Sequence, residues 1–346
     1  MKIIPDFIDP IITSSVYCEG YLDHVAFMAL KPFRDSARSS CGGSFFLWTV
    51  RYGKGGEHLK IRIHAPRSQE DLLRSLLEDH VTRSFALLPP PSSTKSGDNW
   101  PAAQAIDPED LVQDAYPDRT LRWTSYQRSH VSLGPHPLPE DDLYVHLCTR
   151  CFAAATDLFL NLPFGASGLS HTQRHLALFK VLAVGLDALD LPAERVASYL
   201  LYHRNWVLRF CLLKNWWNRD QANRFIDLFN RRIREKEMLE PAMSGLEDVQ
   251  RFVIEEEGYQ VWQSRLRSLV SYVSKLEDLL DPFATWPEYP PLLKVFNGTS
   301  NQFGLRLMDE AFLYHLLLIA LCERSSLCVA TSYSNGELAP EEVSSR

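Results

Sequence analysis

Hydrophobic and polar side chains alternate along residues 45–66, which read FFLWTVRYGKGGEHLKIRIHAP. Aromatic and β-branched residues on both sides of the glycine-rich turn predict two strands joined as a hairpin. Successive side chains of a strand point to opposite faces, so the second strand has one aliphatic face and one basic face. The basic row consists of His58, Lys60, Arg62 and His64. The pattern therefore predicts a cationic, polar surface over an apolar core, and we interpret this surface as a site.

Residues 124–135, TSYQRSHVSLGP, alternate in the same way. Their polar row consists of Tyr126, Arg128, His130 and Ser132. We expect this run to form a strand near the hairpin, because two such rows together would form a continuous polar floor. From the pattern alone, Arg62 and Arg128 either hold a carboxylate or an enolate-like oxygen, or belong to a solvated strand face.

The rest of the pattern is mainly helical. Amphipathic spacing predicts helices over 15–33 and 68–86, before and after the hairpin. Later helices are predicted over 140–162, 171–189, 194–213, 219–239, 246–279 and 306–323. The fold class is therefore α+β, with an antiparallel sheet and flanking helices early in the chain and a mostly helical part after it.

The chain is predicted to form one domain over residues 1–330. Its α+β part covers 1–135 and its helical part covers 136–330. Residues 88–110 are rich in proline, serine and aspartate, which predicts a mobile surface loop. We expect residues 331–346 to form a disordered tail.

The composition narrows the function classes. A formal net charge of −7 argues against a general nucleic-acid binder, which is usually basic. No stretch approaches the ~20 apolar residues of a membrane helix, and the first residues lack the pattern of a signal peptide. Seven cysteines at irregular spacing are typical of reduced thiols. We therefore expect a cytoplasmic protein that binds neither nucleic acid nor a membrane.

Three local motifs have a simple structural interpretation. Cys148 and Cys151 form a lone CxxC inside a helical pattern, and a zinc site needs about four ligands, so we predict no metal site there. The glycine turn at 53–56 lacks the spacing of a phosphate-binding loop and joins two strands. His203 lies in an aromatic, apolar helix, where a histidine is more often a hydrogen-bonded core residue than a general base.

A polar run lies between two apolar segments near the end of the chain and reads Asn297-Gly298-Thr299-Ser300-Asn301-Gln302. Buried amides and hydroxyls need hydrogen-bond partners. The run therefore predicts either an elaborate loop cap or part of a cavity wall.

Three segments, in order along the chain, carry recognisable motifs. The first is the aromatic strand 48–52, which is followed after the glycine turn by the basic strand 58–62. The second lies in TSYQRSHVSLG, with Tyr126, Arg128 and Gly134 at the motif positions. The third runs over residues 297–304 and is followed by the acids Asp309 and Glu310.

Together these segments resemble the C-terminal elimination domain of lantibiotic dehydratases and the related thiopeptide-type bacteriocin biosynthesis proteins. In that family the corresponding runs are I-R-Y, a glycine turn and H-L-R-L-R, then Y-x-R-E-I-x-R-Y-G, then H-M-x-x-N-R-L-x-G. The resemblance covers about residues 15–325. It implies the fold of the elimination domain.

The departures from the family pattern carry the most information about function. Family eliminases remove glutamate from glutamylated serine or threonine side chains with a glutamate, an arginine and a histidine. The matching positions here are Ser129, Ser132 and Asn297, and an arginine of the third motif is replaced by Gln302. Of the family's functional group only Arg62 remains. Loss of a carboxylate, a guanidinium and an imidazole removes the acid–base set for β-elimination.

A branch of this fold that looks repurposed in this way is formed by the pyridine synthases of thiopeptide biosynthesis. They join two dehydroalanines of a leader-bearing, azole-containing peptide by a formal aza-[4+2] cycloaddition and then release water and the leader. The resemblance implies this macrocyclising activity in a bacterial cytoplasm, without a cofactor or metal. The implied partner is a ribosomally made precursor peptide with a leader, azoles and dehydroalanines.

On this hypothesis Arg62, with His58 near it, binds the reacting amide oxygen, and Tyr126 and His130 transfer protons. Neutral hydroxyls and amides bind the amide that tautomerises. The full catalytic set comprises Arg62, Tyr126, His130, Ser129, Ser132, Asn297, Ser300 and Asn301. The substrate-binding set comprises His58, Lys60, Arg128 and Gln302.

Two alternatives remain open from the sequence. One is the glutamate-eliminating subunit of a split tRNA-dependent lantibiotic-type dehydratase, which would need the three lost residues from elsewhere. The other is a non-catalytic escort that binds the leader peptide and presents it to other enzymes.

Overall fold

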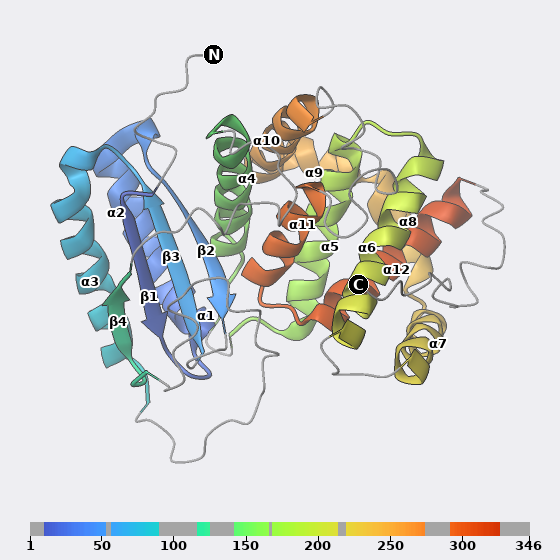
Figure 1. Cartoon of the computed structure of the whole chain (residues 1–346), viewed down its shortest axis with the longest axis horizontal. Helices are drawn as coiled ribbons and strands as arrows, with labels where there is room; N and C mark the ends of the chain where they lie inside the picture. The colour runs from blue at the N-terminus through green and yellow to red at the C-terminus, as the bar shows by residue number, and fades with distance from the viewer. Residues whose placement is uncertain are drawn as a thin grey trace, which may run out of the picture.

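The computed structural model describes residues 10–52, 57–89, 116–124, 142–165, 168–213, 219–273 and 291–325. A sheet with its own helices occupies one side of the molecule and a group of helices occupies the other (Figure 1). The α+β class predicted from the sequence is confirmed, with the sheet early in the chain and the helical part after it.

The sheet has four strands in the order β2-β3-β1-β4, and every neighbouring pair is antiparallel. The strands are β1 (Ile12–Tyr17), β2 (Phe46–Tyr52), β3 (His58–His64) and β4 (Thr120–Trp123). The helices between them are α1 (Leu22–Val25), α2 (Lys31–Cys41) and α3 (Glu70–Ala86), with a π-helical stretch, Ala26–Leu30, joining the first two. This βαββαβ order is the ferredoxin-like arrangement, in which helices cover one face of the sheet.

The predicted helix over 15–33 is wrong at its start, because residues 12–17 form the strand β1. This strand lies between β3 and β4 and is buried along its whole length. Its β-branched residues Ile12, Thr13 and Val16 suit a paired, extended backbone better than a helix. Helix begins only at Leu22, after a turn in which Gly20 adopts a positive φ of 74°.

The helical part agrees with the predicted periodicity at most positions. Its helices are α4 (Asp142–Leu160), α5 (His171–Ala188), α6 (Ala193–Leu213), α7 (Arg219–Glu235), α8 (Leu239–Glu247), α9 (Val249–Glu255), α10 (Glu257–Val273), α11 (Pro291–Gln302) and α12 (Leu307–Arg324). The single helix predicted over 246–279 is wrong, because the chain leaves helical geometry at Asp248 and Glu256. The breaks give α8, α9 and α10 separate directions, and all three pack against α5.

The polar run 297–302 is helical and forms the second half of α11, so the loop-cap interpretation is wrong. Gly298 lies against the ring of Phe152 on α4, and a side chain at this position would meet that ring. The glycine therefore allows α11 to approach α4 closely. Thr299 and Ser300 return their hydroxyls to carbonyls one turn earlier, at 2.8 and 3.1 Å.

Strand β2 lies at one edge of the described sheet, and helices α4 and α11 satisfy its outward backbone groups. The N–H of Thr49 donates to Oγ1 of Thr156 on α4 at 3.2 Å. The amide of Asn301 on α11 both accepts from the N–H of Arg51 at 2.7 Å and donates to its carbonyl at 3.0 Å. An edge strand with unpaired backbone groups invites pairing with another chain, so these contacts close the sheet.

A partly buried ion-pair cluster joins the same elements, and we call its members, Asp23, Arg51 and Arg174, the latch. Arg51 donates to Asp23 at 2.6 Å, and Arg174 pairs with both carboxylate oxygens of Asp23. The two guanidinium groups also donate to the carbonyls of Gln302 and Phe303, at 3.2 and 3.0 Å. Cations at a helix C-terminus complement the helix dipole, so the latch holds the end of α11 against α1, β2 and α5.

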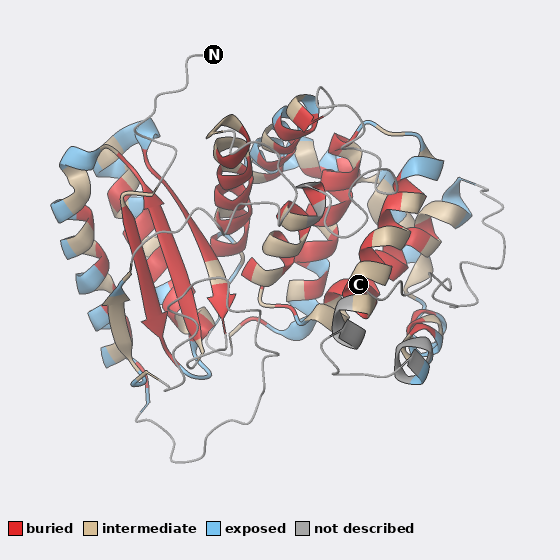
Figure 2. Ribbon diagram, in the orientation of Figure 1, coloured by how far each residue is buried: buried red, intermediate tan, exposed pale blue. Residues whose placement is uncertain are grey.

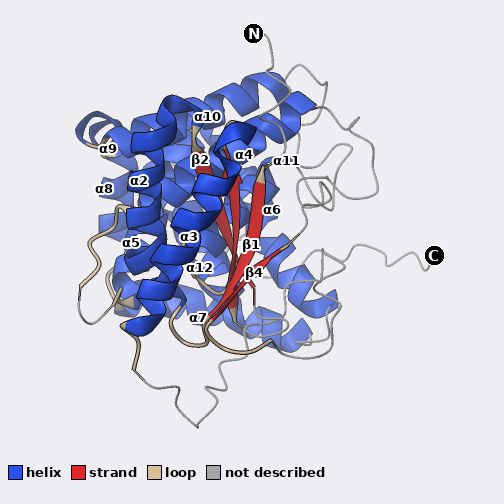
Figure 3. Cartoon of the chain, turned by 90° about the vertical axis from the view of Figure 1, so that its left-hand side faces the viewer, coloured by secondary structure: helices blue, strands red, loops and turns tan. Residues whose placement is uncertain are grey.

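The core is continuous across the sheet and the helices. Figure 2 shows strands β1 and β3 buried throughout, with exposed residues gathered on the outer surfaces of α2 and α3. Figure 3, turned by 90°, shows the helices crowded around the strands. The single-domain prediction stays a prediction. Of its loop at 88–110 only residues 88 and 89 are described, and its tail at 331–346 lies outside the described residues.

We predict that Asn301→Ala destabilises the fold by about 1–3 kcal/mol, because it leaves the N–H and C=O of Arg51 without partners at a buried edge. Urea denaturation of the two proteins measures the difference. Gln260→Ala, which truncates an exposed amide on α10, is the control and should change stability by less than about 0.5 kcal/mol. Equal stability of wild type and Asn301→Ala would show that the contacts of Asn301 with the edge strand do not stabilise the fold.

Candidate functional site

The basic row of β3 lies on the face of the sheet opposite the aliphatic row, as predicted, but it is buried rather than open. Each basic residue meets an aromatic ring. The strand register places Trp48 opposite Arg62 and Phe46 opposite His64. The Arg62 guanidinium lies 4.7 Å from the Trp48 ring centroid, and His64 stacks on Phe46 at 4.3 Å. The aromatic rings thus fix the orientation of the basic side chains.

The second half of the row is built in the same way. The ammonium of Lys60 lies 4.4 Å from the Tyr52 ring, and His58 stacks on that ring at 5.5 Å. Tyr17 on β1 approaches His58 from the other side at 4.5 Å. Trp48 Nε1 also contacts Nε2 of His64 at 3.3 Å, so the imidazole accepts from the indole. The result is a layer in which basic side chains and aromatic rings alternate.

A row of hydroxyl residues continues this face onto β1, and the sequence analysis missed it. The register places Thr13 opposite Arg62, Ser15 opposite Lys60 and Tyr17 opposite His58. All three hydroxyl residues are buried. The signal was the alternation of Thr, Ser and Tyr in ITSSVY, whose last three residues were predicted to begin a helix.

Five of the predicted site residues lie outside the described part of the chain. They are Tyr126, Arg128, Ser129, His130 and Ser132. Strand β4 ends just before them at Trp123 and pairs with β1, so the sheet does extend toward this segment. The predicted strand over 124–135 stays a prediction.

Asn297 and Ser300 of α11 lie beside a buried carboxyl group, Glu310 on α12. Asn297 donates to Glu310 at 3.0 Å, and the hydroxyl of Tyr314 donates to the other carboxyl oxygen at 2.8 Å. Burial raises the pKa of Glu310 to about 8, although hydrogen bonds from Tyr314, Asn297 and Ser300 act in the opposite direction. The carboxyl is therefore mostly protonated at neutral pH. We call Asn297, Ser300, Glu310 and Tyr314 the neutral cluster.

His203 of α6 lies next to this cluster and is surrounded by aromatic side chains. It is fully buried, 4.1 Å from Tyr199 and 5.0 Å from Tyr314 between ring centroids. Among the described residues neither ring nitrogen has a hydrogen-bond partner. Burial lowers the pKa of His203 well below its ordinary value, so the imidazole is neutral. The sequence predicted a core position, and the structure confirms that position but not the expected hydrogen bond.

The last two predicted residues of α11 differ from each other in surroundings. Asn301 uses its amide oxygen and nitrogen on the backbone of Arg51 and so pins the helix to the sheet. Gln302 is buried, and neither atom of its amide has a hydrogen-bond partner within the described ranges. A buried amide without partners costs free energy unless something else binds it, so Gln302 stands out as a group available for hydrogen bonding.

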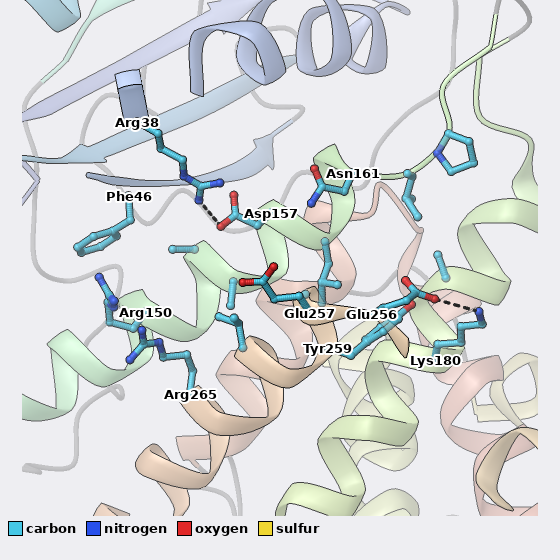
Figure 4. Close-up of a pocket in the computed structure, with 18 of the residues that line it drawn as sticks. Arg38, Phe46, Arg150, Asp157, Asn161, Lys180, Glu256, Glu257, Tyr259 and Arg265 are labelled. Atoms are coloured by element: carbon cyan, nitrogen blue, oxygen red, sulfur yellow. Dashed lines mark hydrogen bonds and ion pairs between the residues drawn. The ribbon is translucent and has the colours of Figure 1, made fainter. Parts of the chain in front are cut away.

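A cleft of about 830 Å³ opens between β2, α4, α5 and α10. Figure 4 shows charged side chains reaching into it from several elements, including Arg150 and Arg265 near Phe46 and Glu257 above Tyr259. Arg150 lies over the Phe46 ring at 4.7 Å, and that ring stacks on His64. The cleft therefore begins at one end of the basic row. Its volume is in the range of ~300–1,000 Å³ that is typical of ligand sites.

Two other sets of residues bear on metal binding. Cys148 and Cys151 lie on α4 and are buried, as predicted for residues packed on a helix. Burial raises the pKa of both thiols, to about 12 for Cys148. Thiols protonated in this way are poor ligands. Within the part of the chain that the structure describes, one group has the spacing of metal ligands, and it consists of His171, His175 and Asp309.

No helix among the described residues has the length and apolar character needed to span a membrane.

Comparison with known structures reveals the same fold in two proteins. The first is a pyridine synthase from thiomuracin biosynthesis, TbtD, with a TM-score of 0.59 and 17% sequence identity; the match covers 90% of this chain and 97% of that one. The second is TsrL, with a TM-score of 0.53 and 15% identity, covering 95% of this chain and 98% of that one. A search of curated proteins finds no match.

The sequence also matches a protein family over almost all of the described fold. Residues 12–321 match the family described as the lantibiotic biosynthesis dehydratase C-terminal part. The match begins at β1 and ends within α12, so it takes in the sheet, the latch and the neutral cluster together. The chain therefore belongs to the lantibiotic biosynthesis dehydratase C-terminal family.

Proposed function

We propose that this protein is a thiopeptide pyridine synthase, an enzyme that closes a macrocycle in a ribosomally made peptide. The observation that carries the proposal is the likeness to a pyridine synthase over 97% of that protein's chain. The residue replacements support it as well. Serine or asparagine stands where the resemblance expects the acid–base set of an eliminase, at Ser129, Ser132 and Asn297.

The proposed reaction joins two dehydroalanines of one peptide. The amide of one residue tautomerises to its iminol, which makes a 2-azadiene, and this adds to the alkene of the other in a formal [4+2] closure. Two new C–C bonds, one at each terminal carbon of the azadiene, close the six-membered ring. Loss of water and then of the leader peptide as its C-terminal amide gives the aromatic pyridine. No oxidant or cofactor enters the balance.

Neutral hydrogen-bonding groups suit this chemistry, because tautomerisation needs a donor and an acceptor rather than a strong base. The neutral cluster supports this part of the proposal. Glu310, with its pKa raised to about 8 by burial, holds Asn297 through a hydrogen bond while remaining uncharged at neutral pH.

The polar face of the sheet supplies the cationic part of the proposed site. We propose that Arg62 binds the oxygen of the reacting amide, with His58 and Lys60 beside it. Arg62 is fixed over Trp48, so its orientation costs little additional entropy when substrate binds. Tyr126 and His130 remain the proposed proton-transfer groups, and Ser129, Ser132, Ser300 and Asn301 the proposed partners of the tautomerising amide. Arg128 and Gln302 remain proposed substrate contacts.

The cleft supports a peptide substrate. It combines apolar walls such as Leu158 and Leu176 with charged groups such as Arg265, which is the mixed lining that a peptide needs. Holding the precursor in the cleft would bring its two dehydroalanines together. Such positioning can lower the activation barrier by up to ~7–11 kcal/mol in well-oriented intramolecular reactions.

Mass spectrometry tests the proposal directly. The purified protein is incubated alone with a leader-bearing, azole-containing peptide that carries two dehydroalanines. We expect a macrocycle that has lost water, together with intact leader released as its C-terminal amide, because both eliminations accompany aromatisation. The same peptide with one dehydroalanine replaced by alanine is the control and should stay unchanged.

Other products would identify the alternatives. Release of free glutamate from a glutamylated precursor would mean that the protein is an eliminating subunit. Tight leader binding without any change in the mass of the core peptide would mean that it is an escort. Either result would reject the pyridine synthase proposal.

We predict that Arg62→Lys lowers turnover by about 10²-fold, because lysine keeps the charge but cannot orient two donors on one oxygen. Lysine is used rather than alanine because Arg62 is buried and alanine would leave a cavity. Arg74→Lys is the matched control: Arg74 also lies over a tryptophan, Trp123, at 4.6 Å, but on α3. Turnover is measured with the peptide described above, and equal rates in the two variants would remove Arg62 from the site.

Glu310 also predicts a dependence of stability on pH. Its folded pKa, about 8, is above the unfolded value near 4.5, so its contribution is full below about pH 4.5 and is lost as the pH rises through 8. Glu310→Gln keeps the shape of the side chain but cannot ionise, so it should reduce the loss of stability with rising pH. We expect the free energy of unfolding of wild type to fall relative to the variant between these values, by at most ~1.4 kcal/mol per pH unit. Urea titrations across the range measure it, and parallel curves would contradict a raised pKa.

A further inference from the structure

Two histidines and an aspartate meet where α5 and α12 begin. His171 and His175 are four residues apart, on one face of the first turns of α5. Asp309 is in the first turn of α12 and is oriented by its own cap, since Oδ2 accepts from the N–H of Arg306 at 3.4 Å. The three ligand atoms lie within 4.8 Å of one another. Helix geometry and capping thus hold all three side chains in place.

The hydrogen bond of His175 determines which of its nitrogens faces the aspartate. Nδ1 lies 2.8 Å from the carbonyl oxygen of His171, and a carbonyl can only accept, so Nδ1 carries the hydrogen. In the neutral ring Nε2 then bears a lone pair. The His175 side chain is 9% exposed, and its Nε2 lies 3.2 Å from Oδ1 of Asp309.

The same carboxylate oxygen, Oδ1 of Asp309, also lies 3.3 Å from Nε2 of His171. A single cation placed between them could bind all three ligand atoms. In a tetrahedral site with metal–ligand distances of ~2.0–2.1 Å, neighbouring ligands are ~3.3–3.4 Å apart. Both measured distances agree with that edge.

The charge and exposure of the group also suit a metal ion. Two imidazoles with one carboxylate are a ligand set for divalent transition metals. The His171 side chain is 60% exposed, which leaves one side open to water.

We propose that His171, His175 and Asp309 form a binding site for a divalent first-row transition metal such as Zn²⁺, with a fourth position open to solvent. The site is distinct from the cleft, because Gln173, Leu176 and Lys180 carry the opposite face of α5 into that cleft. It lies beside Arg174 of the latch. A bound ion would join α5 to α12 and stabilise the contact between the two helices.

Metal titration of the purified full chain, with any affinity tag removed, tests the proposal. Co²⁺ is the probe, because its visible absorption reports four-coordinate nitrogen and oxygen ligation and differs from that of a thiolate site. We expect one equivalent to bind and to be displaced by Zn²⁺. The melting temperature of the wild type should rise with Zn²⁺.

His171→Ala is the decisive variant, since this exposed side chain can be removed with little effect on folding. It should weaken metal binding by more than about 100-fold and abolish the rise in melting temperature. His80→Ala is the control, because His80 lies on α3 and contacts Phe33 rather than the site. It should bind like wild type.

Three results would overturn the proposal. The first is an absence of saturable binding to the wild-type protein. The second is binding to His171→Ala that equals wild type, and the third is a thiolate absorption band, which would place the ion on a cysteine.

Discussion

The edge of the sheet at β2 is the constraint on which the rest of the structure depends. In the described sheet one side of β2 has no neighbouring strand, so its outward N–H and C=O groups need other partners. Thr156 and Asn301 provide them from two different helices. Because both helices belong to the helical part that follows the sheet in the chain, satisfying the edge also fixes that part against the sheet.

The ion pairs of the latch stabilise the same junction. Asp23 is shared by Arg51 and Arg174, and both arginines donate to carbonyls at the end of α11. Gly304, with a φ of 70°, lies against both guanidinium groups, and its missing side chain is what lets them approach. Burial lowers the pKa of Arg51 to about 10, still well above neutral pH, so the ion pairs persist. Removing one partner would leave a buried charge uncompensated.

This junction decides what surrounds the candidate site. The basic row of β3 is covered and ordered by aromatic rings, while α11 directs Asn297 and Ser300 toward the protonated carboxyl of Glu310. One region therefore offers fixed cations and the other offers uncharged donors and acceptors. On the proposed function, the framework of the family is kept while the acid–base groups at these positions differ.

The sequence by itself determined the α+β class, the helices of the later half and the two faces of β3, because these follow from periodicity. The prediction failed at β1, where strand pairing on both sides outweighed the local pattern. The role of Glu310 could not be predicted, because its carboxyl is neutral only when the helices bury it. Only the tertiary structure decided the edge contacts of Asn301 and the convergence of His171, His175 and Asp309. Such contacts join residues far apart in the chain, and no local pattern encodes them.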